Sequence, residues 1–106
     1  MNKQWYGART VYNAYPNRVS DTKIYEERII VLLATSSDEA IKVAEEEANN
    51  YAKDFGMLYL GYVNVFQLLE ETIKNKSEVY SLLRESNLDS TQYLNSFFDT
   101  GGEKTR

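Results

Sequence analysis

One segment of the sequence, residues 24–69, combines two β-strand patterns with a capped amphipathic helix between them. Residues 24–35 have a β-branched centre and residues 57–69 are apolar on both faces, which is typical of strands. Ser36, with a glutamate three residues later, has the spacing of a capping box at the start of the helix. Gly56 is the residue type that most readily ends a helix in the left-handed conformation. A chain with this order buries its helix against a sheet, which predicts an α+β fold.

The clearest of these signals is the helix over residues 36–56. Its apolar side chains recur at spacings of three and four and therefore share one face. Most of them are alanines, so we expect the helix to lie close against the sheet, with a few larger side chains as its main contacts. The stripe consists of Ala40, Ile41, Ala44, Ala48, Tyr51, Ala52 and Phe55.

Weaker patterns on either side of this segment predict the remaining elements. Residues 4–14 alternate as a strand, which a polar connection joins to residues 24–35 as an antiparallel hairpin. Because residues 24–35 are apolar on both faces, we expect them to form a central strand. Residues 79–83 are expected to form a fourth strand, hairpinned to the third. A short helix is expected at residues 88–98, and the candidates for its cap are Ser86, Asn87 and Asp89.

The expected fold is thus α+β, a single small domain with the order ββαββα. A sheet of about four strands packs on one long capped helix, and a short helix follows at the C-terminal end. We expect the domain to occupy residues 1–99 and the polar residues 100–106 to form a flexible tail. A chain of 106 residues has room for one such domain and its core, but not for two.

Composition disfavours several classes of protein. Cysteine is absent, which excludes disulfides and thiolate zinc sites, and we expect no metal site and no cofactor. The net charge is −4 and the twelve Lys and Arg are scattered, so nucleic acid and anionic membranes are disfavoured as partners. The longest apolar run, residues 29–34, is too short to cross a membrane, and the first residues do not have the pattern of a signal peptide. We therefore expect a cytoplasmic protein.

The sequence also lacks the residues that most often carry catalysis. Histidine and cysteine are both absent, and the five glycines do not form a phosphate-binding loop. We therefore expect no catalytic residues. One enzymatic hypothesis pairs Glu26 or Glu27 with a tyrosine, because strand geometry points one of these two glutamates toward the covered face. The alternative is that one glutamate is solvated and the other pairs with an arginine.

Several short segments carry a family resemblance. They are Tyr25-Glu26-Glu27-Arg28-Ile29, residues 34–40, residues 61–66, Glu78-Val79-Tyr80-Ser81 and Trp5-Tyr6. Over about residues 5–85 the chain resembles a family of small bacterial proteins, the domain-of-unknown-function family 4288. The resemblance implies a bacterial or bacteriophage source, and it implies no activity, because the family is defined without one.

A small anionic ligand, such as a nucleotide, is one candidate partner. Three arginines are expected on neighbouring strands and could grip a phosphate or carboxylate, and tyrosines could form an aromatic platform for a ring. The candidate residues are Arg9, Arg28, Arg84, Tyr12, Tyr62 and Tyr80. The alternative is that each arginine pairs with a glutamate such as Glu26 or Glu78, and that the tyrosines belong to the core or to an interface.

The helix over residues 36–56 offers a second candidate surface, an acidic face for a basic partner protein. Its candidate residues are Asp38, Glu39, Glu45, Glu46 and Glu47. The alternative is an ordinary solvated helix face.

The leading hypothesis is a non-catalytic protein-interaction module that forms homo-oligomers. The strands have more apolar faces than one long and one short helix can cover, and tyrosines outside a core are typical of interfaces. Within this class, the specific version is a bacterial or phage immunity or anti-defence protein that binds a basic partner. A binder of a small anionic ligand ranks second, and an enzyme ranks third.

Overall fold

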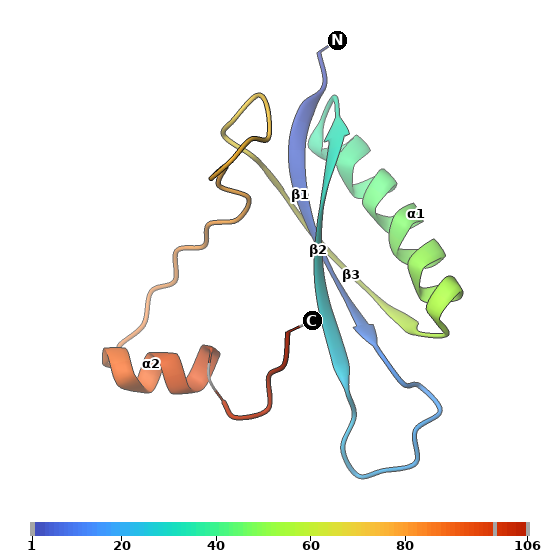
Figure 1. Ribbon diagram of the computed structural model, residues 1–106, viewed down its shortest axis with the longest axis vertical. Coiled ribbons are helices and arrows are strands. Elements are labelled where there is room, and N and C mark those ends of the chain that lie inside the picture. Colours follow the sequence, from blue (N-terminus) through green and yellow to red (C-terminus); the bar gives the residue numbers. More distant parts are fainter. Residues whose placement is uncertain (1, 99, 106) are drawn as a thin grey trace.

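The fold is α+β, as predicted, with three strands and two helices in the order ββαβα (Figure 1). It is seen in a computed structural model that describes residues 2–98 and 100–105. The elements are β1 (Gln4–Asn13), β2 (Tyr25–Ala34), α1 (Ser37–Phe55), β3 (Leu58–Gln67) and α2 (Ser90–Phe97). The expected limits of the domain and of the tail at Met1, Asp99 and Arg106 lie outside the described residues.

The three strands form one antiparallel sheet in the order β2-β1-β3. The central strand is therefore β1, and the expectation that residues 24–35 are central is wrong. β2 is apolar on both faces although it lies at an edge, and its outward side chains Ile29, Val31 and Leu33 remain exposed, so an apolar pattern on both faces does not by itself place a strand at the centre. Because β1 runs antiparallel to both neighbours, β2 and β3 are parallel, and α1 crosses over β1 to connect them (Figure 1).

α1 covers one face of this sheet, and the core lies between the two layers (Figure 1). The buried residues of β1 that face the helix are Tyr6, Ala8, Thr10 and Tyr12. The buried residues of the predicted apolar stripe on α1 are Ala40, Ala44, Ala48, Tyr51 and Ala52. Small side chains let the helix backbone approach the strands closely, so a single row of aromatic and small residues fills the space between the layers.

Capping residues set both ends of α1. The Ser36 hydroxyl accepts a hydrogen bond from the backbone N–H of Glu39 (3.1 Å), as predicted. In a capping box the Glu39 carboxylate would accept a hydrogen bond from the backbone N–H of Ser36. Here it accepts instead from the N–H (3.1 Å) and the hydroxyl (3.0 Å) of Thr35, one residue earlier. These bonds hold the pKa of Glu39 below its usual value, so they stabilise the fold at neutral pH and are lost as the pH falls through the depressed pKa. Gly56, with a φ of 67°, ends the helix as predicted.

The predicted fourth strand at residues 79–83 does not form. A tight turn precedes it, in which Lys76 adopts a left-handed conformation (φ 68°). Beyond this turn, the Tyr80 ring packs on Phe66 of β3, with ring centroids 5.2 Å apart. Tyr80 therefore lies on the face of the sheet rather than beside the edge of β3, and residues 81–83, which follow it, are exposed. In that position they have no neighbouring strand within the described part of the chain.

The predicted C-terminal helix is present, but it stands apart from the sheet (Figure 1). Asp89, one of the three candidate caps, forms a full capping box with Gln92 at the start of α2. None of the helical residues is buried, and within residues 2–98 and 100–105 α2 contacts no other helix or strand. The core of the fold is thus complete without α2.

The cap of α1 can be tested with neighbouring serines. We expect Ser36→Ala to lower the free energy of unfolding by about 1 kcal/mol, because it removes the acceptor for the Glu39 N–H. The matched control is Ser37→Ala, one residue further, which we expect to change stability by less than about 0.5 kcal/mol. Urea denaturation of the three proteins measures both effects. Equal losses for the two variants would contradict the assignment of Ser36 as the cap.

Candidate functional site

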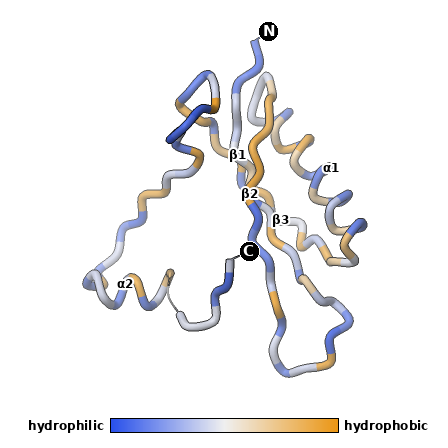
Figure 2. Tube along the Cα trace, viewed as in Figure 1, coloured by the Kyte–Doolittle hydropathy of each residue, from blue (hydrophilic) through white to orange (hydrophobic). Residues whose placement is uncertain are grey.

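The face of the sheet opposite α1 is largely apolar, and within residues 2–98 and 100–105 no helix or further strand packs on it. The strand register places on it the residues Trp5, Arg9, Val11, Ile29, Val31, Leu33, Tyr62, Asn64 and Phe66, which we call the open face. Three neighbours on β2 remain substantially exposed: Ile29 at 42%, Val31 at 40% and Leu33 at 43%. Figure 2 shows that the second half of β2, residues 29–34, is a continuous hydrophobic stretch. A monomer thus leaves a strand of core-like sequence in contact with water.

A glycine shapes the centre of the open face. The ring of Phe66 lies directly over Gly7 of β1, and a Cβ at position 7 would lie 2.2 Å from the Phe66 Cε2 atom. Only the absence of a side chain lets the ring lie flat on the strand. Tyr80 then packs against Phe66 from the segment that follows β3. This contact could not be expected from the sequence, because a lone glycine in a strand has several explanations.

Arg9 is the main charged group of this face, and tyrosines surround it. Its Nη2 donates to the hydroxyl of Tyr62 (3.3 Å) and its Nη1 donates weakly to the hydroxyl of Tyr80 (3.5 Å). The Arg9 Nε is buried and has no hydrogen-bond partner among the described residues. The hydrogen bond to Tyr62 raises the pKa of Arg9 above its usual value, although burial opposes the charge. Three of the six predicted ligand residues therefore lie together here.

Two of the other predicted ligand residues lie on the opposite side of the sheet. Arg28 pairs with Thr10 in the register, one residue out of phase with Arg9, so the two arginines point to opposite faces. The Arg28 Nη1 lies 2.7 Å from a carboxylate oxygen of Glu47, and its guanidinium stacks 3.8 Å from the ring centroid of Tyr51. Tyr12 is fully buried beneath α1. The expected gathering of three arginines on one face therefore does not occur.

The sixth predicted ligand residue, Arg84, belongs to the segment that carries α2. Its Nη1 donates to the hydroxyl of Tyr93 (3.0 Å), and its guanidinium lies 4.1 Å from the ring centroid of Phe97. Arg84 thus holds α2 against the preceding chain. This role is local to the segment and is separate from the open face.

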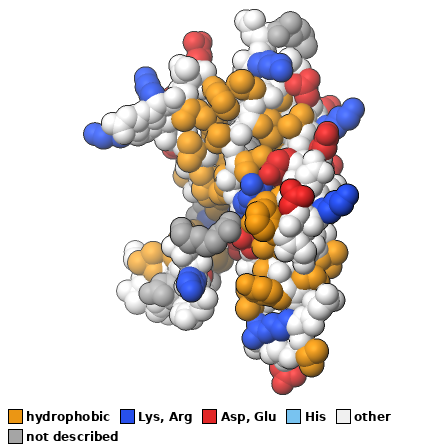
Figure 3. Space-filling view, turned by 45° about the vertical axis from the view of Figure 1, so that its right-hand side comes forward, with side chains coloured by type: hydrophobic (Ala, Val, Ile, Leu, Met, Phe, Trp, Pro, Cys, Tyr) orange, Lys and Arg blue, Asp and Glu red, His pale blue; other side chains and the backbone are white. Residues whose placement is uncertain are grey.

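The predicted acidic face of α1 is partly used by the fold itself. Glu39 binds Thr35 at the start of the helix, and Glu47 pairs with Arg28. Asp38 and Glu46 are exposed and Glu45 is half-buried. Figure 3 shows acidic and basic side chains mixed along one edge of the molecule and hydrophobic ones gathered over its upper middle.

The two glutamates of the enzymatic hypothesis are also separated. Glu26 faces α1 and accepts a hydrogen bond from the hydroxyl of Tyr51 (2.6 Å), whereas Glu27 is exposed on the other side of β2. One glutamate is therefore solvated, as the alternative interpretation holds, and the other accepts a hydrogen bond from a tyrosine hydroxyl.

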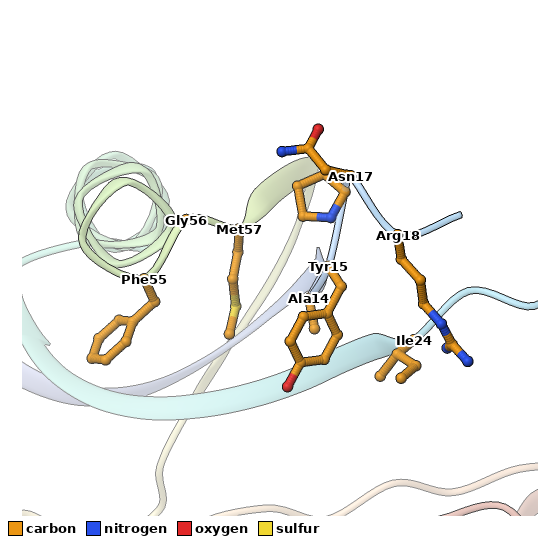
Figure 4. A pocket seen from close by; sticks show the side chains of 9 residues that line it. Ala14, Tyr15, Asn17, Arg18, Ile24, Phe55, Gly56 and Met57 are labelled. Carbon is orange, nitrogen blue, oxygen red and sulfur yellow. The ribbon is translucent and has the colours of Figure 1, made fainter. Parts of the chain in front are cut away.

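A shallow hollow of about 800 Å³ lies at one end of the sheet, at a place that the sequence did not indicate (Figure 4). Phe55 and Met57 line it from the junction of α1 and β3, and Tyr15 and Ile24 line it from the connection between β1 and β2 (Figure 4). Arg18 is its one charged lining residue among those described. The hollow offers apolar contacts but no set of acid and base groups.

Two further classes of site are absent from the described residues. No group of three or more acidic side chains is placed so that it could hold a metal ion within residues 2–98 and 100–105. Neither α1 nor α2 has the length and apolar character that a membrane-crossing helix requires.

The pairing of Arg28 with Glu47 can be tested as a structural contact. We expect Glu47→Gln to lower the free energy of unfolding by about 0.5 kcal/mol, since both side chains remain partly exposed and solvent weakens the pair. The adjacent variant Glu46→Gln is the control and should leave stability unchanged. Urea denaturation at low and high salt measures the difference, which salt should reduce. If both variants behaved alike, the ion pair would contribute nothing to the fold.

Comparison with known proteins gives a family and nothing more specific. Neither the curated proteins nor the solved structures include a match to the chain. One family model, described as a domain of unknown function, matches residues 5–81, which run from β1 to just beyond Tyr80. This range covers the strands of the sheet, α1 and the segment after β3 that carries Tyr80. The chain therefore belongs to the DUF4288 family, as its resemblance had indicated.

Proposed function

We propose that this protein is a non-catalytic interaction module that binds protein through its open face, and that its first partner is a second copy of itself. The observation that supports this most directly is the exposure of Ile29, Val31 and Leu33 on one strand. These side chains are β-branched or large and apolar, as in the buried strands of a three-layer fold. A protein partner would supply the missing layer.

The surface area supports the same proposal. A compact monomer of 12.3 kDa exposes about 6,100 Å², whereas this chain exposes 8434 Å². Its radius of gyration is 16.1 Å, against about 13 Å for a compact chain of this length. The surplus of about 2,300 Å² per chain exceeds the area that each partner buries in a stable protein interface of standard size, about 800 Å². The chain therefore carries enough uncovered surface for a dimer.

The acidic side of α1 suits a further partner of opposite charge. Asp38 and Glu46 are exposed, and neither is used by the two caps or by the Arg28 pair. Together with the net charge of −4, they favour attraction to a basic protein. An immunity or anti-defence role against such a partner is one form that this module could take.

Light scattering tests the proposal directly. We expect the chain to have the mass of a dimer at micromolar concentration, and we expect Val31→Glu to weaken association at least about 30-fold, because it buries an unpaired carboxylate. The control is Val43→Glu on α1, since Val43 has nearly the same exposure, 39% against 40% for Val31, but lies on the other layer. A wild-type protein that stays monomeric at all accessible concentrations would overturn the proposal.

A second candidate function is the binding of a small anion at Arg9. The buried Arg9 Nε lacks a hydrogen-bond partner among the described residues, and two tyrosine hydroxyls lie beside the guanidinium. An anion such as a nucleotide phosphate is the natural partner of such a guanidinium, and Tyr62 offers a ring for stacking. This site consists of the three predicted ligand residues that the fold brings together, Arg9, Tyr62 and Tyr80.

A thermal-shift experiment distinguishes this second candidate. We expect millimolar nucleotide to raise the melting temperature by about 4 °C or more if it binds, because a ligand that is specific for the folded state stabilises that state. Arg9→Gln should abolish the shift, whereas Arg84→Gln should retain it. The absence of any shift across a panel of nucleotides would exclude the site as a nucleotide binder.

A further inference from the structure

We propose that the C-terminal arm, residues 81–98, packs on the open face of a second copy of the chain, and that the second copy returns the same contact. This inference rests on the proposed function and names the segment that makes the interface. It assigns a role to α2, which the compact part of the fold does not use.

The arm has an apolar surface of its own on which no helix or strand outside the arm packs, among the residues that the structure describes. Its most exposed apolar residues are Leu82 at 52%, Leu83 at 96%, Leu94 at 53%, Phe97 at 45% and Phe98 at 61%. They come from both the connecting segment and α2, so the arm is apolar along its whole length. An exposed apolar segment of this size marks an interaction site in a folded protein.

α2 also needs a partner in order to be stable. It has 8 residues, and isolated helices shorter than about 12–15 residues are only marginally stable in water. Its capping box and the ring contact between Tyr93 and Phe97, at 4.8 Å, help to define the helix but bury none of its residues. Packing of an apolar side against another surface is the usual source of the missing stability.

The arm leaves the compact domain from the open face itself. Tyr80 is fixed there by Phe66 and by Arg9, and the residues from 81 to 89 are all exposed. A connection of this length spans up to about 30 Å when it is extended, which is about the length of a ten-residue strand. Figure 1 shows that it carries α2 to the side of the sheet that α1 leaves uncovered, but away from the strands. A second copy that presents its open face to the first would therefore lie within reach.

A second copy fits this arrangement better than an unrelated protein does. Each chain carries one uncovered apolar face and one uncovered apolar arm, so two chains related by a twofold axis satisfy both surfaces at once. The surplus of about 2,300 Å² per chain, relative to a compact monomer, is large enough for a pair of reciprocal contacts. The exchange of identical segments between copies is also a low-cost route to a dimer.

Photocross-linking with isotope labels tests the exchange in the full chain. The photoreactive residue p-benzoylphenylalanine replaces Phe97, and chains grown with ¹⁴N and with ¹⁵N are mixed, unfolded and refolded together before irradiation. Mass spectrometry then identifies the linked peptides and their labels. We expect links from position 97 to peptides of the open face, with about half of the linked pairs carrying one label of each kind, as random pairing in a twofold dimer requires. The control places the same group at Phe55, an exposed ring at the end of α1, and should give no links to the open face.

Each other outcome overturns the proposal. If every linked pair carried a single label and no mixed pair formed, the arm would fold onto its own sheet. Mixed labels that join position 97 to α1, to the hollow near Phe55 or to the other arm would show a different interface, and a dimer without links would show that α2 lies outside it. In these cases a dimeric mass would leave the proposed function intact. A monomeric mass would remove the proposed function together with the exchange.

Discussion

The close contact between β1 and the alanine stripe of α1 is the constraint on which the rest of this structure depends. Alanines at Ala40, Ala44, Ala48 and Ala52 are buried against the sheet. Because they bring few atoms to the core, the larger contacts come from aromatic rings such as Tyr12, which meets Tyr51 edge-on at 5.1 Å. A helix that lies so close to the sheet covers its own face well. It cannot contribute to the other face.

A sheet with two apolar faces needs a third layer, and this chain does not provide one within its compact part. A domain is normally built from two or three layers that bury every apolar face between them. Here β2 is apolar toward α1 and also away from it, yet it lies at the edge of the sheet. The remaining helix is short and touches no element in the described residues. The apolar composition of β2 is therefore the feature on which the proposal of a covering protein partner rests.

Much of the fold could be predicted because its signals are local. The cap at Ser36, the stop at Gly56 and the alternation of β1 each depend on a few neighbouring residues, and all are present. The strand order and the missing fourth strand could not be predicted, because they depend on contacts between distant segments, such as Tyr80 with Phe66. The candidate arginines do not gather on one face, for a related reason. Arg9 and Arg28 seemed to be neighbours on paired strands, but a register shifted by one residue places them on opposite faces.

The charged residues of the open face help to explain how an apolar sheet avoids unlimited association. Arg9 stands among apolar neighbours, and Glu27 is exposed on the same side of β2. Charges on a sheet face and along an edge strand oppose random stacking and edge-to-edge pairing, because each such contact would bury them without partners. A contact between unlike patches that does not close builds filaments, whereas a reciprocal exchange about a twofold axis closes after two chains. In the proposed exchange, a tethered arm and a face that carries charge would therefore close a dimer rather than build an open aggregate.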